Sequence, residues 1–309
     1  MQLNDSQNKA VRHDTGPALV LAGPGSGKTR VITERVRYLI SKCKVRPEHI
    51  LVVTFTKAAA IEMKERYISS YGNAGVWFGT FHSIFFLILR SAYGYSASDI
   101  IKEDEKRKVI SDAFGHFDSD NDSEKDIITD IINEISFVKS KRYDIDSYYS
   151  LKCSAEQFQY IYRQYDKYLR KKRKIDFDDM LVYTYELFAA RKDILAGWQN
   201  RFRYILVDEF QDINKMQFDT IKLIAGDSAN IFAVGDDDQS IYGFRGSKPD
   251  IMLAFKDYYS NAKIINLNVN YRCTDNIVKA ARSLIGNNSL RYYKNIKSAG
   301  MVGECIQVQ

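Results

Sequence analysis

The sequence of 309 residues predicts an α/β fold, in which a parallel sheet carries helices on both faces and is interrupted by an inserted all-helical subdomain. Strand-like and helix-like segments alternate over residues 18–93 and again after residue 204. A glycine-rich segment, residues 22–27, separates the first predicted strand from the helix that follows it. A later apolar run, residues 205–207, leads directly into two carboxylates, as a buried parallel strand does at the carboxyl edge of a sheet.

Apolar periodicity gives the expected elements in chain order. The first part has strands at 18–22, 50–54 and 76–79 and helices at 29–43, 57–70 and 81–93. Strand-like runs then disappear, and residues 95–175 show helical spacing, with Ser154 and Gln157 as a candidate capping box. The alternation resumes with strands at 204–208, 231–235 and 263–267, a helix at 215–225, and a strand-like stretch at 304–309. We therefore expect residues 1–94 and 176–268 to form one domain and residues 95–175 to form the helical insertion.

The composition is that of a globular chain, with 45% hydrophobic residues and a net charge of +6. The longest apolar run, residues 84–89, is far shorter than the roughly 20 residues that span a bilayer. The first residues lack the pattern of a secretory signal, so we expect a cytoplasmic protein that makes no membrane contact. The four cysteines lie far apart and the four histidines do not cluster near them, which argues against a zinc site or a disulfide framework.

Residues 22–29 form a candidate phosphate loop between a predicted strand and a predicted helix. In this context backbone N–H groups and the helix dipole converge on bound phosphate. Lys28 is expected to reach the β and γ phosphates of a nucleotide, and Thr29 to bind Mg²⁺. Ala22 stands where the strict pattern has glycine, at a position that needs only a compact residue. The candidate phosphate-binding residues are Ala22, Gly23, Pro24, Gly25, Ser26, Gly27, Lys28 and Thr29.

Asp208 and Glu209 follow a predicted strand directly. Acids at this position are often helix caps or solvated loop residues. Together with a phosphate loop, however, they fit a scheme in which Asp208 holds Mg²⁺ through water and Glu209 orients and deprotonates the attacking water. The two features together predict a nucleoside triphosphatase.

A second acidic cluster, residues 234–246, also follows a predicted strand. It can be interpreted as a glycine-rich acidic turn. Its position would alternatively place Gln239 beside the γ phosphate of a bound nucleotide. Aromatic and arginine side chains just beyond Gln239 could then form a relay that starts at the phosphate. These side chains are those of Tyr242, Phe244 and Arg245.

Eight short motifs occur in order along the chain, at residues 3–7, 25–30, 54–63, 79–83, 176–179, 207–212, 235–246 and 270–272. They include Leu-Asn-x-x-Gln, Gly-Ser-Gly-Lys-Thr-Arg, Gly-Thr-Phe-His-Ser, Val-Asp-Glu-Phe-Gln-Asp and Asn-Tyr-Arg. Together they resemble the ordered motifs of superfamily 1 DNA helicases of the UvrD/Rep/PcrA type. The resemblance implies a RecA-like P-loop NTPase domain, ATP with Mg²⁺, and translocation on single-stranded DNA in the 3′ to 5′ direction.

The resemblance also implies roles for individual residues. Gln7 would recognise adenine, Arg30 and Tyr271 would sandwich the base, and Arg272 would act as an arginine finger. The implied catalytic residues are Lys28, Asp208, Glu209, Gln239 and Arg272, and the implied DNA contacts are Phe55, Thr80, His82, Tyr242, Phe244 and Arg245. The chain departs from the family pattern at Lys57-Ala58, where Asn-Lys is usual, and at Phe244, where Trp is usual.

The resemblance leaves several functions open. Residues 269–309 are expected to begin a second RecA-like domain that is truncated here, so we expect a monomer with weak hydrolysis and no unwinding. The main interpretation is the N-terminal motor portion of a DNA helicase in repair or replication, acting on single-stranded DNA and single/double-strand junctions. One alternative is part of a RecB/AddA-like helicase-nuclease subunit. Another is a nucleotide-switched single-strand binding module that does not hydrolyse ATP.

A basic run occupies residues 170–174 at the end of the predicted insertion. Most such runs are solvated helix faces. Because this one leads into the motif at 176–179, a second hypothesis is that it contacts the DNA backbone. The aromatic residues between 158 and 168 have helical spacing and are expected to form core.

Overall fold

The computed structural model describes residues 2–116, 124–240 and 249–307. Contacts divide the chain into two compact units, one formed by Met1–Phe81 with Asp193–Gln309 and the other by His82–Lys192. We call them the sheet unit and the helical unit.

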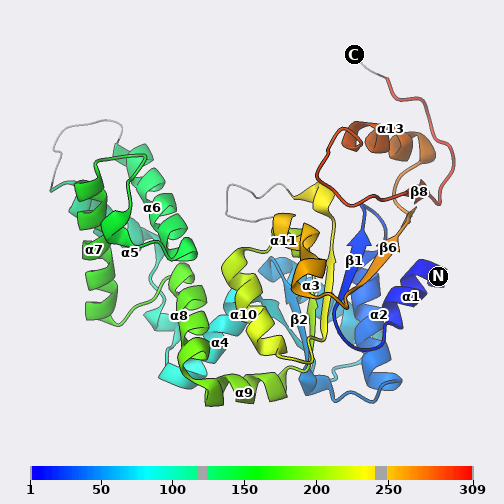
Figure 1. Ribbon diagram of the computed structural model, residues 1–309, viewed down its shortest axis with the longest axis horizontal. Coiled ribbons are helices and arrows are strands. Elements are labelled where there is room, and N and C mark those ends of the chain that lie inside the picture. The colour runs from blue at the N-terminus through cyan, green and yellow to red at the C-terminus, as the bar shows by residue number, and fades with distance from the viewer. Residues whose placement is uncertain (1, 117–123, 241–248, 308–309) are drawn as a thin grey trace. The chain divides into compact units, whose positions relative to one another are not determined.

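The sheet unit contains six parallel strands in the order β3-β2-β4-β5-β1-β6 (Figure 1). They are β1 (Ala18–Ala22), β2 (Ile50–Thr54), β3 (Trp77–Thr80), β4 (Tyr204–Val207), β5 (Ile231–Gly235) and β6 (Lys263–Leu267). Every residue of β1, β2 and β5 is buried, which explains their unbroken apolar sequences, since a central parallel strand is covered on both faces. Because all strands run the same way, the segments that follow β1, β4 and β5 leave the same edge of the sheet.

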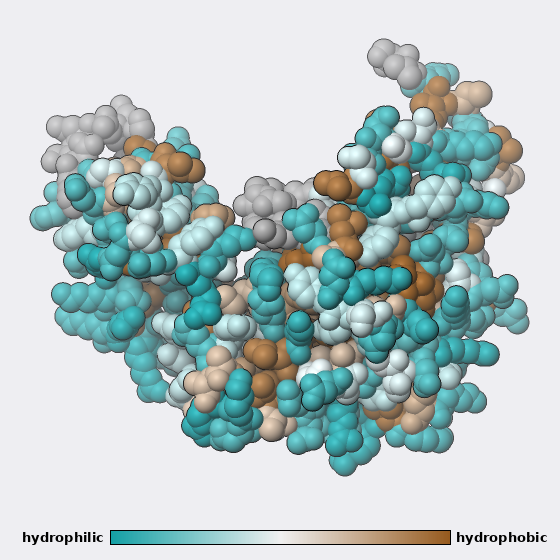
Figure 2. Space-filling view, in the orientation of Figure 1, coloured by the Kyte–Doolittle hydropathy of each residue, from teal (hydrophilic) through white to brown (hydrophobic). Residues whose placement is uncertain are grey.

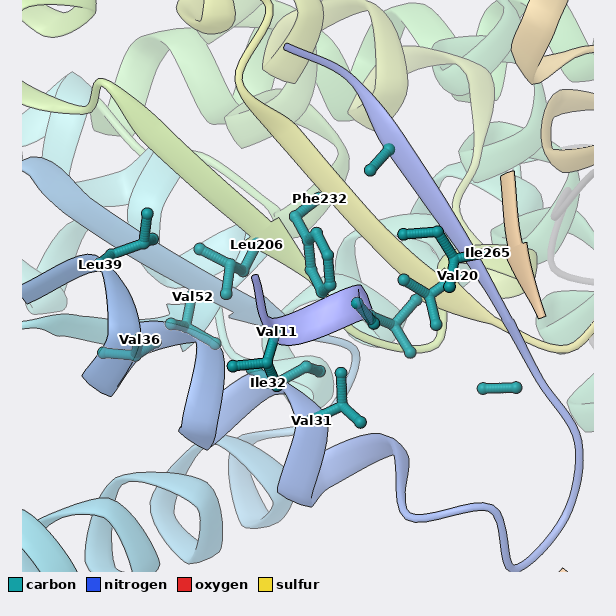
Figure 3. Packing of buried hydrophobic residues seen from close by; sticks show 14 of the residues in the cluster. Val11, Val20, Val31, Ile32, Val36, Leu39, Val52, Leu206, Phe232 and Ile265 are labelled. Atoms are coloured by element: carbon teal, nitrogen blue, oxygen red, sulfur yellow. The ribbon is translucent and has the colours of Figure 1, made fainter. Parts of the chain in front are cut away.

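One face of the sheet is covered by α1 (Asp5–Val11), α2 (Lys28–Ser41) and α3 (Lys57–Tyr71). Figure 3 shows this core, in which the labelled strand residues Val20, Val52, Leu206, Phe232 and Ile265 pack with Val11, Val31, Ile32, Val36 and Leu39 of the helices. Leu19 and Leu21, whose side chains point to the other face, are buried as well, so that face is also covered. The prediction of a parallel sheet with helices on both faces is confirmed.

The sheet unit has further helices and short turns. The helices are α9 (Lys192–Arg201), α10 (Lys215–Ala225), α11 (Pro249–Leu253), α12 (Phe255–Tyr258) and α13 (Asp275–Ile285), and the 3-10 turns are η1 (Pro47–His49), η4 (Phe210–Asp212) and η5 (Asp237–Gln239). A separate two-stranded parallel sheet joins β7 (Val269–Asn270) to β8 (Lys297–Ser298). A strand was expected at 304–309, but residues 304–307 form none and 308–309 lie outside the described residues. That expectation is wrong for 304–307, since an alternating pattern becomes a strand only where another strand pairs with it.

The helical unit consists of α4 (Phe81–Tyr93), α5 (Glu103–Phe114), α6 (Glu124–Lys141), α7 (Ala155–Lys172) and α8 (Phe177–Ala190), with the turns η2 (Ala97–Asp99) and η3 (Ile145–Ser147). Phe158, Ile161 and Tyr165 of α7 are fully buried, which confirms that the aromatic stripe is core. The predicted capping box of Ser154 and Gln157 is present at the start of α7.

The helical unit is wider than the insertion expected at 95–175, because α4 and α8 belong to it. Thr184 of α8 donates a hydrogen bond to the carbonyl oxygen of Phe85 in α4 at 3.4 Å, and α8 packs against α6. The two helices that flank the insertion in sequence therefore pack with it. Within the described residues, none of the helices combines the length and the apolar character that a membrane crossing would need.

Candidate functional site

The loop between β1 and α2 is closed by its own hydrogen bonds. The Ser26 hydroxyl donates to the carbonyl oxygen of Gly23 at 2.7 Å. Gly25 and Gly27 have φ values of 66° and 86°, in the left-handed region that favours glycine. A Cβ atom at Gly25 would also lie 2.8 Å from Oδ1 of Asn270. The loop therefore requires glycine at both positions, as a backbone that approaches a ligand closely does.

Helix α2 begins at Lys28, and no side chain of residues 2–116, 124–240 or 249–307 caps its N-terminus. The first N–H groups of such a helix, together with its dipole, favour an anion. Lys28 forms an ion pair with Glu209, with 2.6 Å between Nζ and Oε2. A phosphate bound at the loop would compete with Glu209 for this ammonium group. Thr29 follows Lys28 in the first turn of the same helix.

Strand β4 delivers the acids Asp208, Glu209 and Asp212. Glu209 has a φ of 48°, which is an uncommon backbone conformation for a residue with a side chain. Oδ1 of Asp208 and Oδ1 of Asp212 are buried and have no hydrogen-bond partner among the residues that the structure describes. Burial and then the charge of Glu209 raise the pKa of each of these two aspartates to about 6. Buried carboxylate oxygens are costly unless they are satisfied, so these two aspartates fit a divalent cation that takes its other ligands from phosphate and water. Within the described residues, no three His, Cys, Asp or Glu side chains are grouped so as to hold a metal by themselves.

Gln211 joins the acids after β4 to the loop after β5. Its Nε2 donates to Oε2 of Glu209 at 2.9 Å, and its Oε1 accepts from the backbone N of Asp236 at 2.9 Å. Nε2 of Gln239, at the end of η5, donates to Oδ2 of Asp236 at 2.6 Å. Gln239 also lines a cavity of about 280 Å³ together with Pro24 of the phosphate loop. Gln239 and the phosphate loop thus line the same cavity, and its placement beside a γ phosphate stays a prediction.

The residues expected to bind a base gather on another side of the loop. Gln7 is buried, its Nε2 donates to the carbonyl oxygen of Ser26 at 2.9 Å, and its Oε1 accepts from the backbone N of Asn4 at 3.1 Å. The Asn4 side chain in turn donates to the Tyr271 hydroxyl at 2.7 Å. Each end of the Gln7 amide therefore has a protein partner, and each end keeps capacity for one further hydrogen bond, such as one to adenine. Arg30 lies in the first turn of α2.

The segment after β6 is tied to the phosphate loop. The backbone N of Tyr271 donates to the carbonyl oxygen of Gly25 at 2.9 Å, and Nδ2 of Asn270 donates to that of Pro24 at 2.8 Å. Oδ1 of Asn270 accepts from the backbone N of Arg272 at 2.8 Å. These contacts place Arg272 beside the loop, with an exposed side chain. Sequence reasoning assigned no role to Asn270 or to Gln211, although both occur inside the motifs that carry the resemblance.

The residues predicted to contact DNA fall into three groups. Phe55 follows β2 and Thr80 ends β3, and the pairing of Thr54 with Thr80 puts them at the same edge of the sheet. His82 belongs to the helical unit, where burial lowers its pKa and its ring packs edge-on against Phe177 with centroids 5.3 Å apart. The other three predicted residues, Tyr242, Phe244 and Arg245, lie outside the described residues.

Comparison with known proteins gives a consistent result. Residues 3–260 match the model of the UvrD/REP helicase N-terminal domain. The protein YjcD of Bacillus subtilis is 41% identical over 308 residues, which cover 96% of this chain and 40% of YjcD. The ATP-dependent DNA helicase PcrA of Staphylococcus epidermidis is 37% identical, over 99% of this chain and 43% of PcrA. The PcrA of Staphylococcus aureus is also 37% identical, over 98% of this chain and 42% of that protein. The chain thus spans about two fifths of the length of these relatives.

Proposed function

Because the chain belongs to the UvrD/REP helicase N-terminal domain family, we propose that it binds ATP with Mg²⁺ and forms the N-terminal motor portion of a 3′ to 5′ DNA helicase. The observation that carries this proposal is the pair of unsatisfied buried carboxylate oxygens, on Asp208 and Asp212, beside the Lys28–Glu209 ion pair. A closed phosphate loop with an uncapped helix completes the site. Few structural roles require this combination of buried acids and an unblocked anion site.

Each residue of the site has a distinct part in the proposed hydrolysis. Lys28 and Thr29 would bind the triphosphate and its cation, and Asp208, which has a buried unsatisfied oxygen, would hold the cation through water. Bound Mg²⁺ would neutralise negative charge on the β and γ phosphates. Glu209, once Lys28 turns to phosphate, is free to accept a proton from the attacking water. The amide of Gln239 approaches the γ phosphate.

Further residues around the phosphate site are proposed to contact the adenine, the γ phosphate and the DNA. Tyr271 and Arg30 would enclose the adenine, with Gln7 at its edge, and Arg272 would place positive charge on the γ phosphate. Phe55, Thr80 and His82 would contact single-stranded DNA, where stacking on aromatic side chains is independent of sequence. The proposal also includes action at single/double-strand junctions and a role in DNA repair or replication. It further includes a cytoplasmic location.

Residues 269–309 are proposed to begin a second RecA-like domain. The strands β7 and β8 pair with each other and do not extend the six-stranded sheet. Figure 2 shows hydrophobic residues at the surface around α13 and the segment that follows it. The exposed hydrophobic side chains there are those of Ile277, Leu284, Leu290, Met301, Val302 and Ile306. Exposed apolar groups at this density are typical of a surface that another part of a protein covers.

The test is to measure MgATP binding and hydrolysis with and without a single-stranded DNA oligomer, using Glu209→Gln as the control. We expect ATP to bind and turnover to stay near that of the control, because the chain spans only about two fifths of its relatives. Turnover that DNA stimulates and Glu209→Gln abolishes would show that this chain alone is a working motor. Failure to bind ATP at all would refute the proposal.

A further inference from the structure

A short return segment, residues 291–294, comes back from α13 to the acidic loop that follows β5. Its Lys294 contacts the carboxylates of three consecutive residues, Asp236, Asp237 and Asp238. The distance from Nζ is 2.5 Å to Oδ1 of Asp237 and 2.8 Å to Oδ2 of Asp238. The Lys294 side chain is only 2% exposed. One buried ammonium group therefore holds all three acids.

Two other residues of the return segment bind the same loop. Arg291 makes a two-pronged contact with Asp238, with 2.8 Å from Nε to Oδ1 and 2.6 Å from its terminal nitrogen to Oδ2. The backbone N of Tyr292 donates to Oδ2 of Asp237 at 2.7 Å. The Tyr292 hydroxyl donates to the carbonyl oxygen of Leu253 in α11 at 3.0 Å, which anchors the segment on its other side. The acidic loop is thus fixed from one direction by several charge-assisted hydrogen bonds.

The contact between Lys294 and Asp236 reaches Gln239. Oδ1 of Asp236 accepts from Lys294, and Oδ2 of the same carboxylate accepts from Nε2 of Gln239 at 2.6 Å. An amide nitrogen carries two hydrogens, so one remains to donate to a phosphate oxygen. Fixing Asp236 consequently fixes the direction in which the Gln239 amide points.

Charge gives the return segment a second effect on the same loop. Burial disfavours the charge on Lys294, but Asp236 and the two following acids outweigh it and raise the pKa of Lys294 above its ordinary value. The ammonium therefore stays charged. Without it, three carboxylates would lie beside the cavity that Pro24 and Gln239 line, where they would repel the γ phosphate of a nucleotide.

We propose that Lys294 is a positioning residue that orients Gln239 through Asp236 and so favours a nucleoside triphosphate over a diphosphate. This inference rests on the proposed function, because it assigns the selectivity of the same nucleotide site. The ammonium group does not touch the nucleotide itself. Its influence is expected to appear in the preference for the γ phosphate and not in the binding of the rest of the nucleotide.

The experiment measures dissociation constants for MgADP and for a non-hydrolysable MgATP analogue by calorimetry. In Lys294→Met we expect the ratio of the ADP constant to the analogue constant to fall about tenfold, with ADP binding little changed. Lys297→Met is the matched control, since Lys297 is exposed and lies three residues further along the chain. Lys294→Arg should restore much of the preference.

A double-mutant cycle with Gln239→Ala separates positioning from simple folding support. If Lys294 acts mainly through Gln239, the double variant loses clearly less selectivity than the sum of the losses in the two single variants. Any loss beyond that of Gln239→Ala alone measures the charge of the three carboxylates. Lys294→Met combined with Asp237→Asn relieves the excess charge should the single variant unfold, as judged by its melting curve. Equal weakening of both nucleotides, or full additivity with Gln239→Ala, would overturn the inference. A wild-type chain that binds neither nucleotide would instead refute the proposed function.

Discussion

The two units each bury a cluster of acids around a lysine, and the two clusters are completed to different degrees. In the helical unit, Nζ of Lys139 lies 2.8 Å from Oδ2 of Asp176 and 2.7 Å from Oδ1 of Asp179. The other oxygen of each aspartate accepts from the backbone N of its companion, at 2.8 and 3.1 Å. Tyr165 donates to Asp176 as well, at 2.9 Å. Every oxygen of these two carboxylates has a partner.

In the cluster of the sheet unit, by contrast, some carboxylate oxygens have no hydrogen-bond partner among the described residues. Within the described part of the chain, Lys28 pairs with Glu209 alone, and Oδ1 of Asp208 and of Asp212 has no hydrogen-bond partner. The aspartates of both clusters are buried, and both sets of acids belong to motifs that carry the family resemblance. Sequence alone assigned chemistry only to Asp208 and Glu209. The difference indicates that the acids at 176–179 join helices of the helical unit, whereas those at 208–212 keep bonding capacity for a ligand.

Removing the lysine from each cluster should give the largest difference between a structural cluster and a ligand-binding one. Lys139→Met removes the nearest cation of the buried carboxylates, although Lys106 remains 3.7 Å from Asp176. The substitution is expected to lower the free energy of unfolding by about 3–5 kcal/mol. Lys28→Met, at a site that is more exposed and built for a ligand, should change it by less than about 1 kcal/mol and abolish nucleotide binding. Denaturant titration measures the first quantity and calorimetry with MgATP the second.

Lys167→Met is the control for these two substitutions, because Lys167 is an exposed lysine of α7. It should leave both the unfolding free energy and nucleotide binding unchanged. Equal destabilisation by Lys139→Met and Lys28→Met would show that both clusters are structural, and the comparison would fail.

Neutralising one acid in each cluster should give effects of opposite sign. Asp208→Asn removes a buried, unsatisfied charge and is expected to stabilise the chain by about 1 kcal/mol while weakening its Mg²⁺-dependent nucleotide binding. Asp176→Asn removes one of the two carboxylate partners of Lys139 and should destabilise the chain. Thermal melts without nucleotide compare the two variants. Destabilisation by Asp208→Asn would mean that this carboxylate already has a structural role.

The raised pKa of Asp208 makes both the stability of the chain and its Mg²⁺-dependent nucleotide binding depend on pH. Burial and the charge of Glu209 raise it to about 6, so the folded chain holds a proton that the unfolded chain has already lost. This group therefore contributes stability at low pH that is lost as the pH rises from about 4 to about 6. Mg²⁺ binding needs the ionised form, so the affinity for MgATP should fall as the pH drops below about 6. Titrations at several pH values test this, and Asp208→Asn should weaken the dependence, because Asp212 has a pKa raised to about 6 as well.

Local sequence patterns predicted the parts of the site that are continuous in the chain. The phosphate loop and the acids after β4 are readable because a strand, a turn and a helix follow one another there. The contact between Lys294 and Asp236 spans 58 positions and has no periodic signature. Gln211 sits in a recognised motif, yet its bridge to Asp236 depends on the packing of β4 beside β5. Such contacts follow from strand order, which periodicity does not encode.

The basic run at 170–174 is a second case in which local sequence does not show the contacts. Its five residues look equivalent in sequence, but they have different partners in the structure. Arg170 pairs with Asp166, Arg173 donates to the carbonyl oxygen of Tyr93, and Lys174 pairs with Glu105. The two remaining lysines, Lys171 and Lys172, are exposed. The hypothesis of a DNA backbone contact therefore narrows to this pair.

Replacing these two lysines gives the smallest effect that we predict. If they contact phosphates, Lys171→Gln with Lys172→Gln should reduce the salt dependence of DNA binding by up to about two units of slope and leave the melting temperature unchanged. Lys108→Gln with Lys167→Gln removes the same charge from exposed sites of α5 and α7 and serves as the control. Fluorescence anisotropy with a single-stranded oligomer over a salt series measures the slope. The same slope in both double variants would mean that net charge alone acts, and that the run is a solvated helix end whose paired members hold the helical unit together.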